Sequence, residues 1–486
     1  MKRFFAIILM LLLLSVSLFA CNGPVSGDNN TSGGDTSAGD TSYGEVDFDD
    51  RANVKDSLPE KDWGGRTFTI LQRTEFKYEF GVEETGASTV NDLIYERDAL
   101  VEERFNVEIK SLNVDGAWGV HEDFINYVRD SIATGNIEYD IIAGYAAVIP
   151  TLVADGVFID WNTVPHIDLN RDWWSQDLID ELTVNGKLYL LSGDISLLFW
   201  ESMQGMFFNK TMAENAGIEN LYDVVRDGEW TFDKMMEVIK QAHVADDNLD
   251  TRTYGYTSAL TTQVDVYLDA FDIPVTTKDA DGMPYYTVNQ EKTYNALDMV
   301  YDLLCASDYF HKADLKDDSV EFFGQNRALF LPAPLGKGSV LNSYDCNYGI
   351  LPMPKYDTEQ ETYHSTCEDA YSLMAIPILK DGDLDFIGMI TEALCAQSYR
   401  SVVPEWYTVI LQNRYTKDDD SIEMIETIRE GILCNFGYIY SLALDWPAHQ
   451  LNICINNNSN DFASLWESKQ TTFENNLADC LDAYFD

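Results

Sequence analysis

The chain has 486 residues, with 82 acidic against 32 basic side chains and a formal net charge of -50. This balance excludes a nucleic-acid-binding protein, because such binding depends on Lys and Arg neutralising phosphates. The residues from 54 to 486 are too many for one simple hydrophobic core, so we expect two domains or lobes.

The N-terminus has the pattern of an export signal. Lys2 and Arg3 precede an apolar run over residues 4–14, and small residues lead to Ala20. That run is short for a membrane-spanning helix of about 20 residues, so we interpret residues 1–20 as a signal peptide that is removed.

Residues 18–21, Leu-Phe-Ala-Cys, resemble the lipobox of bacterial lipoproteins, although Phe19 departs from the small or β-branched residue usual there. The resemblance implies that Cys21 is acylated and anchors the mature protein to the outer face of the cell membrane. Residues 22–50 follow with seven acidic and no basic side chains and with abundant Gly, Ser, Thr and Asn. Such a composition cannot form a core, so residues 21–53 are predicted to be a flexible, lipidated tether.

The remaining cysteines predict neither a disulfide framework nor a zinc site, because they are odd in number, widely spaced and without a C-x-x-C motif. We expect no metal or other cofactor. The sequence leaves open whether Cys346 and Cys367 lie on neighbouring strands and pair. The seven are Cys305, Cys346, Cys367, Cys395, Cys434, Cys454 and Cys480.

The first elements alternate between strand and helix. Strands are predicted over residues 66–72, 107–112 and 139–144, where β-branched and aromatic side chains gather. Helices are predicted between them, one capped by Ser88 or Thr89 and one with apolar side chains at 124, 128 and 132. The alternation indicates an α/β lobe with parallel strands. Ligands of such sheets bind at the carboxyl ends of the strands, here residues 73–75 and 145–147.

A series of short segments then resembles the extracellular solute-binding proteins of carbohydrate ABC importers, of the maltose-binding-protein type. Their order and spacing carry the resemblance, which covers nearly the whole mature chain. The segments are 139–142 (YDII), 152–160 (LVADGVFID), 184–189 (VNGKLY), 193–196 (GDIS), 206–210 (MFFNK), 216–218 (AGI), 228–233 (GEWTFD), 323–330 (FGQNRALF) and 348–356 (YGILPMPKY).

This resemblance implies a type II periplasmic-binding-protein fold, with two α/β lobes that are each discontinuous in sequence and a ligand cleft between them. Lobe one is expected at 66–196 plus 331–371, and lobe two at 197–330 plus 372–486. The chain is expected to cross between the lobes near 194–199, 328–331 and 371–375. Residues 279–282, Asp-Ala-Asp-Gly, suggest a calcium loop, but the twelfth position would be Val288 instead of Glu. A hairpin turn is predicted there.

No catalytic motif is present, since the sequence has no G-x-S-x-G, no phosphate-binding P-loop and no H-E-x-x-H. Aromatic side chains beside carboxylates fit sugar recognition, because rings cover the apolar face of a sugar and carboxylates accept its hydroxyl hydrogens. Each Trp could equally belong to the core. Trp173, Trp174 and Trp230 are assigned to structure. The candidate ligand-binding residues are Arg73, Tyr145, Asp194, Trp200, Glu201, Asp369, Tyr371, Trp406 and Trp446.

The sequence therefore predicts a monomeric binder without enzymatic activity, which captures a carbohydrate, most simply an oligosaccharide, and delivers it to an ABC permease. A peptide or another polar solute is the alternative ligand. A surface glycoside hydrolase or an adhesin on the same lipid anchor is the alternative class of protein.

Overall fold

The computed structural model describes residues 51–82, 84–243, 248, 252–411 and 419–485. The signal peptide, Cys21 and all but the last three residues of the tether lie outside these ranges, so their predictions stay predictions. No helix among the described residues combines the length and the apolar character that crossing a bilayer requires.

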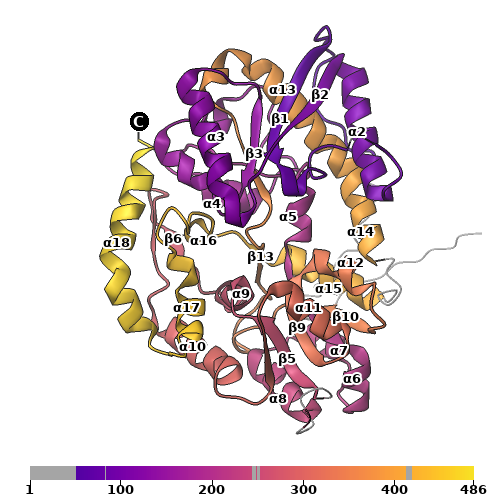
Figure 1. Ribbon diagram of the computed structural model, residues 1–486, viewed down its shortest axis with the longest axis vertical. Helices are drawn as coiled ribbons and strands as arrows, with labels where there is room; N and C mark the ends of the chain where they lie inside the picture. Colours follow the sequence, from indigo (N-terminus) through magenta and orange to yellow (C-terminus); the bar gives the residue numbers. More distant parts are fainter. Residues whose placement is uncertain (1–50, 83, 244–247, 249–251, 412–418, 486) are drawn as a thin grey trace, which may run out of the picture. The chain divides into compact units, whose positions relative to one another are not determined.

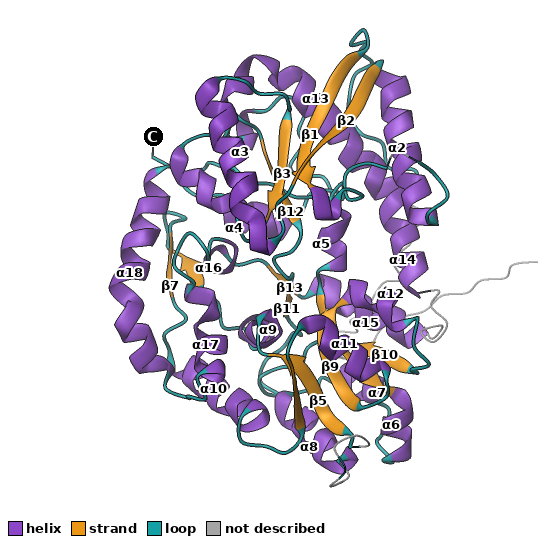
Figure 2. Ribbon diagram, in the orientation of Figure 1, coloured by secondary structure: helices purple, strands orange, loops and turns teal. Residues whose placement is uncertain are grey.

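The first lobe is built on a four-stranded sheet in the order β12-β3-β1-β2 (Figures 1 and 2). Strands β2 and β3 flank β1 in parallel, and β12 is antiparallel to β3. The predicted parallel α/β arrangement is confirmed. The strands are β1 (Arg66–Arg73), β2 (Val107–Val114), β3 (Ile141–Tyr145) and β12 (Ser372–Ala375).

Helix α2 is an element of the first lobe whose two ends are determined by local sequence signals. Its N-cap is Ser88, whose side chain accepts a hydrogen bond of 3.1 Å from the Asn91 amide, as predicted. It ends where Asn106 adopts a left-handed conformation that a polar short side chain tolerates. The helices of this lobe are α2 (Thr89–Phe105), α3 (His121–Thr134), α4 (Gln176–Leu182), α13 (Leu384–Gln397) and α14 (Val403–Leu411).

The second lobe is built on a five-stranded sheet in the order β10-β4-β9-β5-β8. Its strands are β4 (Gln204–Asn209), β5 (Tyr254–Ala259), β8 (Phe310–Ala313), β9 (Ala328–Pro334) and β10 (Tyr348–Leu351). The helices are α6 (Lys210–Asn215), α7 (Leu221–Arg226), α8 (Phe232–Ala242), α9 (Thr262–Ala270), α10 (Glu291–Leu304), α11 (Lys316–Gly324), α12 (Gly338–Leu341) and α15 (Asp419–Glu430).

The C-terminal part of the chain adds α16 (Phe436–Ile439), α17 (Gln450–Asn456) and α18 (Phe462–Asp482); α17 packs on α9 and α10 of the second lobe, whereas α18 packs on both lobes. Strands β11 (Ser365–Thr366) and β13 (Ile432–Leu433) form a short parallel pair. Strands β6 (Thr276–Lys278) and β7 (Pro284–Tyr286) form the antiparallel hairpin predicted in place of a calcium loop.

The predicted lobe boundaries are wrong for residues 331–371. Strand β9 lies inside the second sheet, and β10 pairs antiparallel with β4, from Tyr348 opposite Asn209 to Leu351 opposite Met206. The chain therefore does not cross at 328–331. It crosses first through α5 (Leu197–Glu201), which lies between the lobes in Figure 1, and returns between β10 and β12. Residues 372–411, predicted in lobe two, belong to the first lobe through β12, α13 and α14, and Phe386 of α13 packs against Phe68.

Cys346 and Cys367 do not pair. Cys346 Sγ faces the Phe323 carbonyl, whereas Cys367 Sγ donates to the Phe199 carbonyl beside the first crossing. All seven described cysteines are free thiols, and five of them are buried, as small apolar side chains are.

Candidate functional site

The carboxyl ends of three parallel strands meet at one edge of the first sheet. Arg73 is the last residue of β1, Tyr145 is the last residue of β3, and Trp118 follows the end of β2. Trp118 opens a short 3-10 helix, Trp118–Val120, directly before α3. The strand-end rule had pointed to Arg73 and Tyr145, and the structure adds Trp118, to which the same rule applies.

Arg73 is held rigidly at this edge. It is 1% exposed, and its Nη2 donates to the Ala370 carbonyl at 2.6 Å and to the Ser372 hydroxyl at 3.3 Å. Its guanidinium lies 4.6 Å from the ring centre of Phe76 and 4.6 Å from that of Tyr145. Burial lowers the pKa of Arg73, against the neighbouring carboxylates of Glu79 and Glu75, and the group stays charged. The Arg73 guanidinium therefore holds the rings of Phe76 and Tyr145 close to itself.

Five aromatic residues form a cluster beside Arg73. Trp118 is 50% exposed and stacks on His121, with ring centres 4.9 Å apart. Its edge meets Tyr145 at 6.2 Å and Trp446 at 5.6 Å, the latter with an interplanar angle of 70°. Trp446 also lies 5.1 Å from the ring of His449. We call these residues the aromatic cluster; it joins Trp118 of the first lobe to Trp446 of the second.

The backbone turn after α16 places Trp446. Asp445 and Trp446 both adopt left-handed conformations, with φ of 66° and 71°, and the Trp446 amide donates to the Ser441 carbonyl at 2.7 Å. Such a conformation is costly for a bulky side chain and persists only where the surroundings enforce it. Helix α16 ends at Ile439, and the Trp446 side chain beyond it is partly exposed.

Carboxylates lie beside the aromatic cluster. Asp265 is 3% exposed. Its Oδ2 accepts hydrogen bonds from His449 Nδ1 at 2.5 Å and from Asn452 Nδ2 at 2.7 Å. Its Oδ1 has no hydrogen-bond partner among the described residues. Burial opposes protonation of His449, but the Asp265 charge and hydrogen bond outweigh it and raise the pKa of His449. The Tyr438 hydroxyl is likewise buried without a partner among the described residues.

Asp369 lies at the junction of these groups. Burial and the adjacent Glu368 raise the pKa of Asp369 to about 6, and its charge in turn acts on Tyr145, His449 and Lys316. Lys316, at the start of α11, is bound to Glu368 in an ion pair. Asp369 keeps some exposed surface and accepts no hydrogen bond from the described residues, so its carboxylate can accept one from a ligand.

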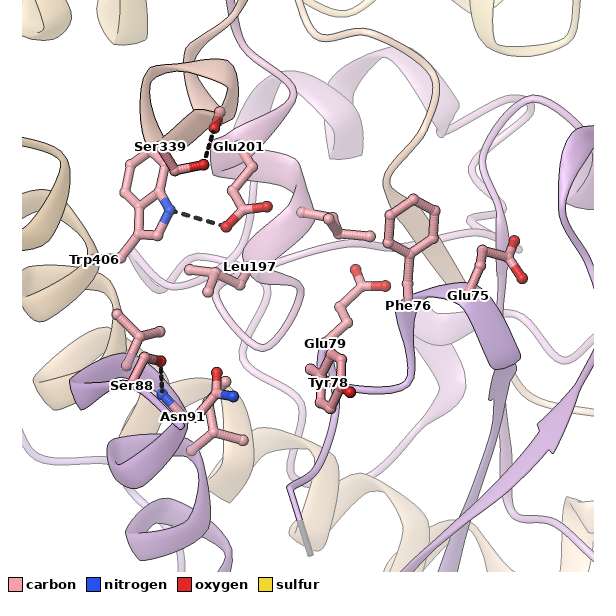
Figure 3. A pocket seen from close by; sticks show the side chains of 14 residues that line it. Glu75, Phe76, Tyr78, Glu79, Ser88, Asn91, Leu197, Glu201, Ser339 and Trp406 are labelled. Atoms are coloured by element: carbon pink, nitrogen blue, oxygen red, sulfur yellow. Dashed lines mark hydrogen bonds between the residues drawn. The ribbon is translucent and has the colours of Figure 1, made fainter. Parts of the chain in front are cut away.

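A pocket of about 330 Å³ includes Phe76, the ring that Arg73 contacts (Figure 3). The loop after β1, the start of α2, α5, α14 and the segment before α12 each contribute to it. Trp406 Nε1 donates to Glu201 Oε1 at 3.3 Å across its wall, and burial raises the pKa of Glu201. The lining residues are Glu75, Phe76, Tyr78, Glu79, Ser88, Val90, Asn91, Ile94, Leu197, Leu198, Glu201, Gly336, Ser339 and Trp406.

Glu79 closes the inner side of this pocket. It is buried and accepts hydrogen bonds from the hydroxyls of Ser196 and Ser372, the latter at 2.6 Å. Burial raises the pKa of Glu79 to about 7, although the Arg73 charge and both hydrogen bonds act in the opposite direction. Glu79 therefore ties the loop after β1 to the first crossing and to β12.

Three predicted site residues lie behind this surface. Trp200 donates from Nε1 to Asp194 Oδ1 at 3.2 Å, and both line a separate pocket of about 350 Å³. Asp194 is 5% exposed, and burial raises its pKa to about 7. Tyr371 is buried with its ring 5.1 Å from that of Phe199. Four of the predicted residues therefore lie together at or near the aromatic cluster: Arg73, Tyr145, Asp369 and Trp446. Glu201 and Trp406 line the pocket of about 330 Å³. Asp194, Trp200 and Tyr371 are buried beside the first crossing between the lobes.

The described residues include no group of three or more His, Cys, Asp or Glu side chains arranged to hold a metal ion. Trp173, Trp174 and Trp230 are buried, as their structural assignment predicted.

Comparison with known proteins gives the fold. No protein-family model matches the sequence, and no curated protein matches it. Among solved structures, an ABC substrate-binding protein from Listeria monocytogenes in complex with cycloalternan is similar, with a TM-score of 0.54, 13% identity, and 85% of this chain and 99% of that chain covered. A cyclo/maltodextrin-binding protein complexed with maltotetraose has a TM-score of 0.54, 12% identity, and 89% and 98% coverage.

A third similar structure is an ABC transporter solute-binding protein from Thermotoga lettingae bound with α-D-tagatose. It has a TM-score of 0.52 and 12% identity, and the match covers 86% of this chain and 100% of that chain. Together these structures show that the chain has the two-lobed α/β fold of the solute-binding proteins, as the sequence predicted.

Proposed function

We propose that this protein captures a carbohydrate, most simply an oligosaccharide, between its two lobes and presents it to an ABC permease. The aromatic cluster is the observation that carries the proposal. Trp118 and Trp446 come from different lobes, meet at the carboxyl edge of the first sheet, and keep surface that no described residue covers. The similar solved structures, all sugar complexes by name, support the same ligand class.

The chemistry of a sugar suits this arrangement. A pyranose has an apolar face of C–H groups that an indole covers, and a rim of hydroxyls that carboxylates bind. Trp118 and Trp446 offer the rings, and Asp369 and the free Oδ1 of Asp265 offer acceptors. A hydroxyl that donates to a carboxylate forms a charge-assisted bond, which is stronger than one between neutral groups. The site therefore binds by stacking at its walls and by hydrogen bonds at its floor.

Closure of the two lobes follows from how the candidate ligand-binding side chains are distributed between them. Tyr145 and Trp118 belong to the first lobe, whereas Trp446, Asp265 and Lys316 belong to the second. A ligand that contacts both sets stabilises the arrangement in which the lobes approach each other. Small-angle scattering should show a smaller radius of gyration at saturation, and an unchanged radius would argue for a rigid binder.

The proposal includes no chemical step. Asp369 and Glu368 are adjacent in the chain, and Lys316 is bound to Glu368 in an ion pair. A binder returns the oligosaccharide unchanged. Incubation with oligosaccharides and analysis of the products tests this point, since turnover would favour a surface glycoside hydrolase.

The location is part of the proposal and depends on the sequence alone. The lipobox-like residues support acylation at Cys21, which would hold the protein at the outer face of the membrane beside the permease. Cys21→Ala should abolish metabolic labelling by a fatty-acid analogue. Labelling at the wild-type level would contradict the lipid anchor without affecting the binding proposal.

Titration calorimetry on the residues from 51 onward tests the central claim. A panel of linear and cyclic gluco-oligosaccharides, other disaccharides and short peptides is titrated in turn. Binding of one saccharide class and no peptide is expected. Peptide binding without saccharide binding would overturn the carbohydrate proposal and favour the alternative ligand.

A further inference from the structure

The pocket beside Glu201 has an unusual balance of charge. Glu75, Glu79 and Glu201 line it together with the rings of Phe76, Tyr78 and Trp406, and no Lys, Arg or His is among its described lining residues. In Figure 3 the carboxylates of Glu201 and Glu79 lie on opposite sides of the pocket. A negative, aromatic-lined cavity disfavours anions and favours a cation.

Glu201 is the carboxylate whose charge is least compensated. Glu75 forms an ion pair with Arg73 at 3.4 Å, and Glu79 has the charge of Arg73 and two serine hydroxyls near it. Glu201 accepts one hydrogen bond, from the neutral indole of Trp406, and among the described residues no cation pairs with it. A carboxylate removed from water without a counter-charge is costly unless a ligand supplies one.

The pocket and the aromatic cluster share a neighbour. The Arg73 guanidinium lies 4.6 Å from the ring centre of Phe76, which lines the pocket, and 4.6 Å from that of Tyr145, which belongs to the cluster. Residues from both lobes line it, since Leu197 and Leu198 lie on the crossing helix and Gly336 and Ser339 precede and begin α12. A ligand bound at the cluster therefore has the pocket close to it.

We propose that the carbohydrate captured by this protein carries a protonated amine, and that this ammonium group binds against Glu201 in the pocket. The inference rests on the proposed function and narrows its ligand to amino sugars or saccharides bearing an amine. The ammonium forms a charge-assisted hydrogen bond to Glu201, while the surrounding rings cover its C–H groups and favour its charge. A neutral hydroxyl at the same place leaves the Glu201 charge uncompensated.

Matched saccharides test the inference directly. The β-1,4-linked trimers of glucosamine, N-acetylglucosamine and glucose share a backbone and differ in charge, and glucosamine with glucose and galactosamine with galactose provide monosaccharide pairs. We expect the amine-bearing member to bind about 10- to 100-fold more tightly at pH 6, the gain typical of a hydrogen bond to a charged group. Calorimetry and thermal shifts measure the ratio within each pair.

Variants of Glu201 then test whether the preference for an amine arises at this residue. Glu201→Gln removes the charge and should bring the ratio close to one, whereas Glu201→Asp keeps the charge and should retain part of the preference. Glu108→Gln is the matched control, because it removes one carboxylate from the exposed start of β2, and it should leave the ratio unchanged.

The outcomes separate the two proposals. Equal affinities within every pair would overturn this inference, and so would a preference for the amine that survives Glu201→Gln. In either case, binding of a neutral saccharide would still support the proposed function. No binding of any saccharide, charged or neutral, would overturn both.

Discussion

Two pairs of tryptophans occupy the region between the lobes and are used differently. Trp118 and Trp446 meet at 5.6 Å, keep exposed surface, and donate no indole hydrogen bond to a described residue. Trp200 and Trp406 lie 6.2 Å apart, are buried, and donate to Asp194 and Glu201. An aromatic ring beside a carboxylate is therefore not enough to identify a sugar site. The exposed ring with a free face is the one a ligand can use.

The comparison predicts the largest effect at Trp200. Trp200→Ala should lower the free energy of unfolding by about 3 to 5 kcal/mol, because a large buried side chain is lost and a cavity remains. It also leaves Asp194 without its indole donor, while the other oxygen of Asp194 already lacks a partner among the described residues. Chemical denaturation measures the change, and a loss below 1 kcal/mol would mean that Trp200 is not part of the core.

The exposed pair should behave in the opposite way. Trp118→Ala and Trp446→Ala should each weaken saccharide binding by about 1 to 3 kcal/mol, or about 5- to 150-fold, by analogy with aromatic rings that stack on nucleic-acid bases. The unfolding midpoint of Trp118→Ala should stay close to that of the wild type, since half of the ring is already in water.

Tyr95→Ala is the control for this pair, because it removes an exposed ring from α2 away from the aromatic cluster. Calorimetric titration should show unchanged affinity for this variant. Intact affinity in both tryptophan variants, combined with a large loss of stability, would assign the pair to the core and shift the search to Trp406.

The buried carboxylates predict that the free energy of unfolding is higher at acidic pH. Burial raises the pKa of Glu79, Asp194, Asp269 and Glu392 to about 7 each. An acid whose pKa is higher in the folded state binds its proton there first, so stability falls as pH rises from the unfolded value near 4 toward 7. The raised pKa of His449 acts in the same direction, because its contribution is lost as pH rises through the folded value.

The free energy of unfolding should therefore be higher at pH 5 than at pH 8. The contribution of Asp194 alone should be about 2 to 3 kcal/mol, since about two units of its pKa shift lie above pH 5. Asp194→Asn retains an acceptor for Trp200 and should flatten the dependence by that amount in denaturation measured across the range. A stability that rises toward pH 8 in the wild type would show that these carboxylates are better solvated than the structure indicates.

The sequence predicted the first lobe well because its information there is local. The cap at Ser88 and the alternation of strands and helices are each decided by neighbouring residues, and each is confirmed. The lobe boundary failed at 331–371 because strand pairing across the chain is not local. Nothing near Tyr348–Leu351 indicates that this strand lies against β4 in the second sheet.

The candidate site shows the same difference between local and non-local information in the sequence. Residues at strand ends, Arg73 and Tyr145, could be found from the topology of a parallel sheet, and Trp118 could have been found by the same rule. The carboxylate that follows Trp200 in the sequence suggests a sugar site, but the burial of Trp200 depends on distant residues such as Tyr407. The partnership of Asp265 with His449 joins residues from α9 and from the segment before α17, which no spacing reveals.

The smallest effect we predict is the coupling between the two exposed rings. Trp118 and Trp446 meet edge to face across the lobes, and such pairs add about 0.5 to 1.5 kcal/mol beyond their buried area. A double-mutant cycle on the free energy of unfolding, with Trp118→Ala, Trp446→Ala and the double variant, measures this coupling without ligand. Two stacking contacts of about 3.5 to 4.0 Å each do not fit between ring centres 5.6 Å apart, so a sugar ring that stacks on both indoles requires the two side chains to move apart within the closed protein. The coupling should accordingly fall toward zero when the cycle is repeated at saturating saccharide. A coupling that persists unchanged in the complex would place the sugar beside the pair, where it stacks on one ring alone.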